Sequence, residues 1–109
     1  MKDIKILFKR NQKLIDNKKT TNEERSELIR DNKILLDAME DKKHIKIRFE
    51  NYSRDDKGRY HFLGWYPMES EEFCIDTKIK GKSIYKTYKW KNGAIEIMRY
   101  GTYIIEEVA

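Results

Sequence analysis

The spacing of apolar residues changes near residue 44, and this change limits the fold more than any other feature of the sequence. Before residue 44 apolar side chains recur every three or four residues, the period of an amphipathic helix. Beyond it they alternate with polar side chains, the period of a strand with one buried face. The helical positions are Ile4, Leu7, Phe8, Leu14 and Ile15, then Leu28, Ile29, Leu35, Leu36 and Met39; the alternation starts at Ile45, Ile47 and Phe49. Two helices followed by a sheet are expected.

Residues 17–24 separate the two helical segments and carry the signals of a helix end and a helix start. Two lysines favour the end of the first helix. Thr20 with Glu23, or Thr21 with Glu24, has the spacing of a capping box, which would satisfy backbone donors at the start of the second helix. The two helices are therefore expected to form a hairpin.

The C-terminal two thirds of the chain consist of short runs typical of strands, separated by turn-forming residues. These runs are 45–50, 59–66, 73–79, 84–90, 94–99 and 102–106. The predicted fold is α+β, with an N-terminal helical hairpin (1–43) packed on a C-terminal antiparallel sheet or small barrel of five to six strands (44–109). At 109 residues the chain is expected to form a single domain.

Asn92-Gly93 is the strongest turn signal, because this dipeptide favours the two-residue loop whose twist suits paired strands. Such a loop predicts a register in which the partners are Trp90 with Ile95, Tyr88 with Ile97 and Lys89 with Glu96. The outward face would then carry Tyr85, Thr87, Lys89, Glu96, Met98 and Tyr100. On the inward face Lys86 would oppose Arg99, a like-charge pair that either lies beyond the core or meets an anion.

The net charge of +5 is unevenly distributed. Residues 69–77 contain four acidic side chains and no basic one, and 69–72 is expected to be a solvated acidic connection. Residues 78–91, here called the basic segment, contain six lysines and three aromatic residues with no acid. Lysines neutralise phosphates and aromatic rings stack on unpaired bases, so the basic segment suits single-stranded nucleic acid. The alternative is that the lysines are solvated and protect the edge of the sheet from unwanted pairing.

Aromatic residues and cations of this sheet are the predicted partner-binding side chains, because aromatic residues dominate interface energies. They are Lys78, Lys80, Lys82, Tyr85, Lys89 and Tyr100, together with Trp65 and Tyr66. Binding to a protein and binding to RNA or DNA both remain open. The basic first helix offers a second cationic surface, for which a solvated face is the simpler interpretation.

Several classes of protein and site are disfavoured by the residues present. No apolar run reaches the length of a membrane span, so neither a membrane anchor nor a signal peptide is expected. Cys74, with only His44 and His61 as companions, builds neither a disulfide nor a structural zinc site, which favours a reducing, cytoplasmic setting. We expect no cofactor, no metal site and no enzyme activity, because no nucleophile, histidine and carboxylate share a recognisable spacing.

The small size and the richness in lysine, isoleucine, asparagine and tyrosine, as in Asn11–Asn22 and Ile79–Asn92, resemble accessory proteins of phages and mobile elements. Among these the chain is most similar in style to anti-CRISPR proteins. The resemblance implies a non-catalytic inhibitor that binds a Cas nuclease or its guide complex. DNA mimicry is disfavoured because the chain is basic, so contact with guide RNA or with an acidic protein surface is the expectation. The oligomeric state is open, and a dimer is among the alternatives.

Overall fold

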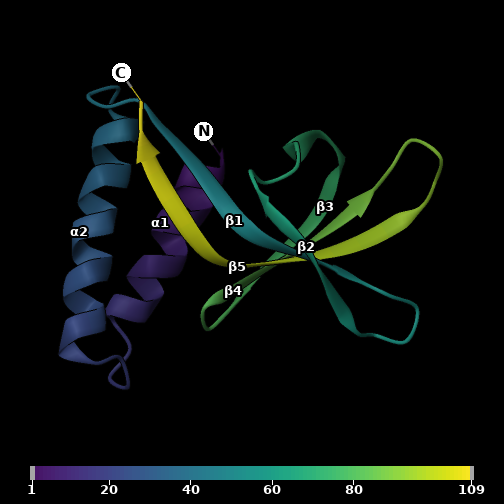
Figure 1. Cartoon of the computed structure of the whole chain (residues 1–109), viewed down its shortest axis with the longest axis horizontal. Coiled ribbons are helices and arrows are strands. Elements are labelled where there is room, and N and C mark those ends of the chain that lie inside the picture. Colours follow the sequence, from purple (N-terminus) through teal and green to yellow (C-terminus); the bar gives the residue numbers. More distant parts are fainter. Residues whose placement is uncertain (1, 109) are drawn as a thin grey trace. The chain divides into compact units, whose positions relative to one another are not determined.

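A computed structural model describes residues 2–108 of the chain (Figure 1). Its elements are α1 (Lys2–Ile15), α2 (Asn22–Met39), β1 (Ile45–Arg54), β2 (Tyr60–Tyr66), the 3-10 helix η1 (Glu71–Phe73), β3 (Cys74–Lys80), β4 (Ser83–Lys89) and β5 (Ile95–Glu107). The predicted α+β class, with two N-terminal helices and a C-terminal antiparallel sheet, is confirmed. Contacts divide the chain into two compact units, one formed by residues up to 46 with 106–108 and the other by residues 47–105.

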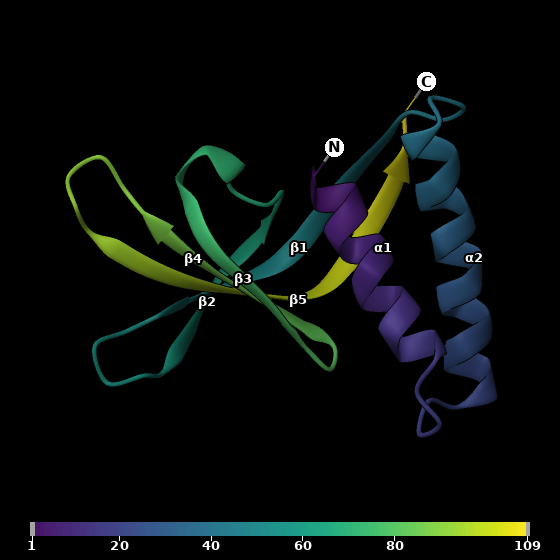
Figure 2. The ribbon, with the colours of Figure 1, turned by 180° about the vertical axis from the view of Figure 1, so that it is seen from behind.

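In the first unit, α1 and α2 form the expected hairpin and lie side by side in both views (Figures 1 and 2). Thr21 is the N-cap of α2, and its hydroxyl accepts a hydrogen bond from Glu24 N at 3.2 Å. Thr20 instead donates its hydroxyl to Leu14 O at 2.6 Å. Of the two capping registers, the one with Thr21 and Glu24 is therefore formed, because Thr20 is engaged in closing the end of α1.

The sheet has five strands in the order β2-β1-β5-β4-β3. It is open, with β2 and β3 at its edges, so the small barrel that the sequence left open is not formed. β5 continues through Gly101 where two separate strands were expected. Gly101 is not in the left-handed conformation; a Cβ there would lie 3.2 Å from Glu50 Oε1. Gly101 therefore makes room for the Glu50 side chain rather than forming a turn.

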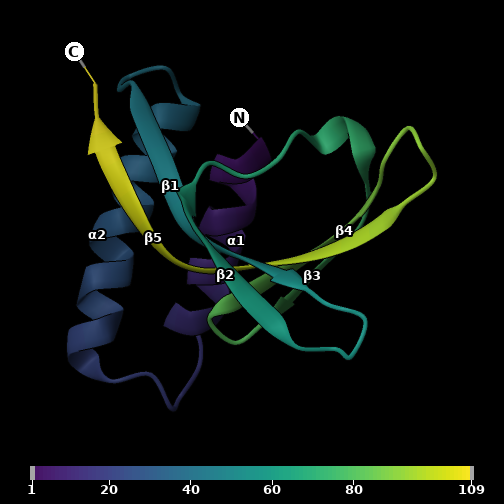
Figure 3. The same cartoon turned by 45° about the vertical axis from the view of Figure 1, so that its right-hand side comes forward.

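Figure 3 shows the hairpin that joins β4 to β5. Its loop has three residues, because Trp90 pairs with Ala94, so the two-residue turn predicted at Asn92-Gly93 is wrong. Trp90 N donates to Ala94 O and Gly93 N donates to Trp90 O, each at 2.9 Å. Gly93 has φ 84, the left-handed conformation that ends such a loop. The two-residue primed turn occurs instead at Gly81-Lys82 between β3 and β4, where Lys80 pairs with Ser83.

The three-residue loop shifts the register of β4 and β5 by one residue. The observed partners are Ile84 with Tyr100, Tyr85 with Arg99, Lys86 with Met98, Thr87 with Ile97, Tyr88 with Glu96 and Lys89 with Ile95. Because directly opposite residues share a face, Met98 and Tyr100 lie on the same face as Lys86 and Tyr88. The prediction that Met98 and Tyr100 point outward is therefore wrong: both are buried, with 2% and 0% exposure.

Lys86 lies in this core and is itself only 1% exposed, but the expected like-charge pair with Arg99 is not formed. Its ammonium group donates to the Glu71 carboxylate of η1, so Lys86 alone meets an anion, whereas both predicted outcomes concerned a pair of Lys86 with Arg99. Nearby, Glu69 N donates to the Tyr100 hydroxyl at 3.3 Å, and the Tyr88 and Tyr100 hydroxyls are 2.8 Å apart. The acidic connection is thus held against the buried face of the sheet and is not merely solvated, because a buried ammonium group needs a carboxylate.

We predict that Glu71→Gln destabilises the fold, because it removes the carboxylate that compensates the buried Lys86. The expected loss is about 2–4 kcal/mol, at the low end for a buried pair because the Glu71 side chain is 30% exposed. Replacing both partners, as Lys86→Met with Glu71→Gln, should restore much of this loss. Urea denaturation gives the free energy of unfolding of Glu71→Gln, of the double variant and of Glu72→Gln, the matched exposed control. Equal stability of Glu71→Gln and Glu72→Gln would contradict the assignment.

Candidate binding surface

One face of the sheet in the second unit gathers tyrosines, a guanidinium group and lysines. β4 alternates strictly: Ile84, Lys86 and Tyr88 are buried, whereas Tyr85 is half-buried on the other side. Across the ladder, Tyr85 lies opposite Arg99 on β5 and opposite Lys78 on β3. Because directly opposite residues share a face, these three side chains belong to one surface, here called the Tyr85 face.

Arg99 lies at the centre of the Tyr85 face, between two tyrosine rings. Its guanidinium carbon is 4.0 Å from the ring centroid of Tyr52 and 5.3 Å from that of Tyr60. The rings of Tyr60 and Tyr85 meet edge to face, with centroids 5.9 Å apart at 66°. We call Tyr52, Tyr60, Tyr85 and Arg99 the Tyr-Arg cluster. Its cation–π and aromatic contacts hold the guanidinium group in a defined position on the surface.

Glu50 supports the cluster from β1. The Tyr52 hydroxyl donates to Glu50 Oε2 at 3.1 Å, and Thr102 N donates to Glu50 Oε1 at 2.9 Å. Hydrogen bonds from Thr102 and Tyr52, with the nearby Arg99 charge, hold the pKa of Glu50 below its ordinary value despite its partial desolvation. The Glu50 carboxylate in turn raises the pKa of Tyr52. Glu50 is therefore ionised and compensated at neutral pH, and it fixes the Tyr52 ring under Arg99.

The lysines of the basic segment divide between the Tyr85 face, the turn and the core. Lys78, Lys80 and Lys89 are exposed, and their ladder partners place them on the Tyr85 face. Lys80 Nζ lies 5.8 Å from the Tyr85 ring centroid. Lys82 occupies the β3–β4 turn. The alternation of the strand thus brings three of the predicted lysines to the same surface as Tyr85.

The predicted aromatic residues fall on different sides of the sheet. Trp65 is half-buried and opposes Glu50, which places it on the Tyr85 face. Tyr66 is 55% exposed but opposes the buried Phe49, so it lies on the other face. Tyr100 is fully buried and its hydroxyl bonds to Tyr88, so it does not belong to the surface on which it was predicted. The one-residue shift in register accounts for the misplacement of Tyr100.

Sequence reasoning missed Arg99, Tyr52, Tyr60 and Phe62, which opposes Tyr52 and is 53% exposed. A signal for the tyrosines was present: the alternation that buries residues 47 and 49 assigns position 52 to the outward face. Tyr60 then follows from the β1–β2 loop, which pairs it with Arg54. Arg99 was assigned to the wrong face by the same register error that misplaced Tyr100.

Two of the residues considered for catalytic chemistry, His61 and Cys74, lie in the second unit and have polar partners of their own. His61 Nε2 is 2.6 Å from Asp55 Oδ2 in the β1–β2 loop, a pair that the sequence analysis did not predict. The hydrogen bond to His61, together with the backbone N–H groups of Arg59 and Lys57, lowers the pKa of Asp55. Asp55 therefore holds the β1–β2 loop in its turn conformation by accepting these hydrogen bonds. Cys74 Sγ lies 3.4 Å from Asp76 O.

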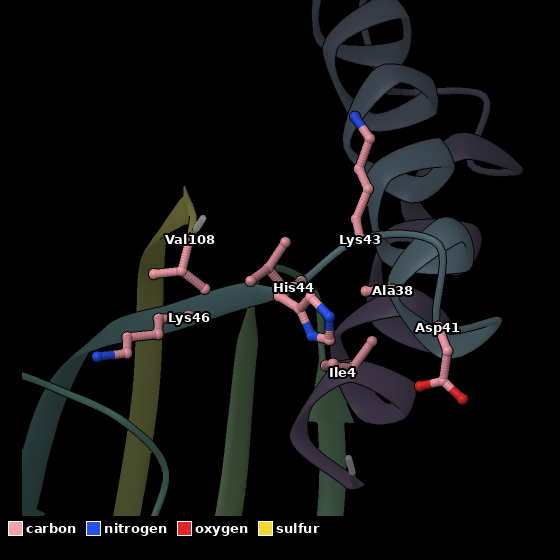
Figure 4. Close-up of a pocket in the computed structure, with 8 residues that line it drawn as sticks. Ile4, Ala38, Asp41, Lys43, His44, Lys46 and Val108 are labelled. Carbon is pink, nitrogen blue, oxygen red and sulfur yellow. The ribbon is translucent and has the colours of Figure 1, made fainter.

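A cavity of 270 Å³ lies within the first unit, at the end of α2 (Figure 4). It is lined by Ile4, Ala38, Asp41, Lys43, His44, Ile45, Lys46 and Val108. Figure 4 shows the His44 ring turned toward Ile4 and Ala38. The second histidine thus borders apolar side chains.

Over residues 2–108, no group of three or more His, Cys, Asp or Glu side chains is placed to hold a metal ion. In the same part of the chain, no helix has the length and apolar character needed to cross a membrane. Comparison with protein-family models, with curated proteins and with solved structures finds no match to this chain.

We predict that Glu50→Gln lowers stability at neutral pH, because Thr102 and Tyr52 lose their charged acceptor. A carboxyl group whose pKa is depressed by folding contributes stability above its unfolded pKa, and this contribution is lost as the pH falls through the folded pKa. The difference in melting temperature between wild type and Glu50→Gln should therefore be largest at neutral pH and shrink in acid, as the pH falls below the ordinary pKa of a glutamate and through the lower pKa of folded Glu50. The exposed Asp56→Asn serves as the control. A difference that does not depend on pH would contradict this role of Glu50.

Proposed function

We propose that this chain is a non-catalytic binding protein that uses the Tyr85 face to hold its partner. In its most concrete form it is an anti-CRISPR-like inhibitor that binds a Cas nuclease or its guide complex. The single observation that carries the proposal is the Tyr-Arg cluster, in which Arg99 is held between Tyr52 and Tyr60 beside exposed lysines. Tyrosine and arginine are the residue types that dominate binding energies at interfaces.

The restricted conformation of Arg99 in the cluster favours a role in binding as well as in stability. An arginine already clamped by two rings loses little conformational freedom when a partner arrives, so less of the interaction energy is spent on ordering it. Lys78, Lys80 and Lys89 add positive charge to the same face and would accelerate association with a negatively charged partner. The inhibitor hypothesis is further supported by the resemblance of this chain to anti-CRISPR proteins in size and composition.

A second candidate is a nucleic-acid-binding module that uses the same face. Aromatic rings and cations together on a sheet are what such modules offer to unpaired bases and phosphates. A ribonucleoprotein partner would suit both candidate functions. Its guide RNA and an acidic surface of its protein would both be attracted by the lysines of the Tyr85 face.

We predict that a triple charge reversal, Lys78→Glu with Lys80→Glu and Lys89→Glu, abolishes partner capture from a host lysate and leaves the fold intact. These side chains are exposed, so their replacement should change the melting temperature little. The matched control reverses three exposed lysines elsewhere, Lys5, Lys18 and Lys57. Undiminished capture by the first variant would overturn the assignment of the Tyr85 face.

The inhibitor form is tested in a second assay that measures DNA cleavage by purified Cas ribonucleoproteins with increasing amounts of this protein. Inhibition that is lost in the triple variant on the Tyr85 face and kept in the control variant is the expected result. Undiminished DNA cleavage by every Cas complex captured from the host would overturn the hypothesis that this protein is an inhibitor. Capture repeated after nuclease treatment separates a protein partner, which is retained, from a nucleic-acid partner, which is lost.

A further inference from the structure

We infer that the Tyr85 face binds an unpaired nucleic-acid strand directly, with the bases stacked on the aromatic rings of β2 and β4 and the phosphates held by Arg99 and the lysines of β3 and β4. The inference rests on the proposed use of this face as the binding surface and names the partner that fits it. RNA and DNA present the same bases and phosphates here, so the shared chemistry of a single strand is the occupant.

The rings of this face are placed as a base-stacking platform requires. Phe62 is 53% exposed and lies against Tyr52, with ring centroids 5.4 Å apart. Tyr60 and Tyr85 continue the row from β2 toward β4, with centroids 5.9 Å apart. Phe62 thus offers an exposed ring surface, the half-buried rings of Tyr60 and Tyr85 lie on the same face, and every base has a π-face that can stack on such a ring.

The cations lie on the same face of the sheet as these rings. Lys78 and Lys80 occupy alternate positions of β3, about 7 Å apart along the strand, and both face the side of Tyr85. Lys89 lies on this face at the end of β4, and Arg99 lies in the middle of the row. Four cations beside three rings allow phosphate neutralisation at several points of one strand while its bases stack.

Negative charge on the face is limited and largely compensated. Glu50 receives hydrogen bonds from Thr102 N and from the Tyr52 hydroxyl, and Arg99 lies beside it. Asp76 is the acidic residue of β3 on this side, opposite Thr87 and two positions before Lys78. The acidic 3-10 helix is engaged on the other face, where Glu71 meets Lys86. The charge over the Tyr-Arg cluster is therefore predominantly positive, which suits the phosphates of a nucleic-acid strand.

A duplex does not fit this arrangement as well as a single strand. Rings on the face of a sheet reach bases only when those bases are unstacked and unpaired. A duplex would contact the lysines through its phosphates and leave the rings unused. The rings should therefore account for a preference for single strands, whereas the lysines should account for the salt dependence.

The test uses the full chain and fluorescent oligonucleotides of mixed sequence, about 12 nucleotides long, within the range that single-strand sites cover. Fluorescence anisotropy gives the affinity for single-stranded RNA, for single-stranded DNA and for the matching duplexes over a series of salt concentrations. We expect single strands to bind at least tenfold more tightly than duplexes. The logarithm of the affinity should fall with the logarithm of the salt concentration with a slope of about −3, as expected for four neutralised phosphates. The ratio between the RNA and DNA arms identifies which strand is preferred.

The variants separate stacking from charge. Phe62→Leu with Tyr85→Leu removes two rings of the row and should weaken single-strand binding at least tenfold with little change of the salt slope. Tyr66→Leu is the matched control, because Tyr66 is equally exposed but lies on the opposite face of the sheet. Circular dichroism melting verifies that each variant is folded. Lys78→Gln with Lys80→Gln should reduce the steepness of the salt slope by about 1.4.

Three outcomes would overturn the inference. These are no binding of either single strand at low salt, binding of duplex as tight as that of single strands, or an equal loss of affinity in the Tyr66→Leu control. A protein partner that survives nuclease treatment, in combination with no oligonucleotide binding, would overturn this inference and leave the proposed function standing. The two claims are thus distinguishable.

Discussion

The register between β4 and β5 is the constraint on which the rest of the sheet depends. The three-residue loop that ends at Gly93 pairs Tyr85 with Arg99 and Lys86 with Met98. A loop shorter by one residue would exchange the faces of one strand relative to the other. Arg99 would then face the core, and the Tyr-Arg cluster would not form.

The same register leaves a charged side chain in the core. Lys86 alternates with Ile84 and Tyr88 and is buried with them, and the Glu71 carboxylate compensates its charge. Burial also raises the pKa of Tyr88 and Tyr100, whose hydroxyls bond to each other beneath the acidic connection. One face of the sheet is thus closed by η1 and its ion pair. The other face is left with the cluster and its exposed lysines, so one alternation determines both the stability of the core and the surface open to a partner.

The period change near residue 44, the helical hairpin and most strand bounds were predictable, because they depend on local spacing of apolar side chains and on capping residues such as Thr21. The loop length at Asn92-Gly93 was not, because the dipeptide suits both a two-residue turn and the end of a longer loop. That single ambiguity misplaced Tyr100, Met98 and Arg99 together. The contact between Lys86 and Glu71 joins residues 15 apart in sequence across a bulged strand pair, and no local pattern indicates such contacts.

The most direct measurement of the central claim is a map of the contacted residues by amide chemical shifts in ¹⁵N-labelled protein titrated with a single-stranded oligonucleotide. We expect the largest shifts at Phe62, Lys78, Tyr85 and Arg99, with Tyr66 and the helices α1 and α2 little affected. Shifts concentrated on the helices, or on the face that carries Tyr66, would contradict binding by the Tyr85 face and assign the binding surface to another part of the chain.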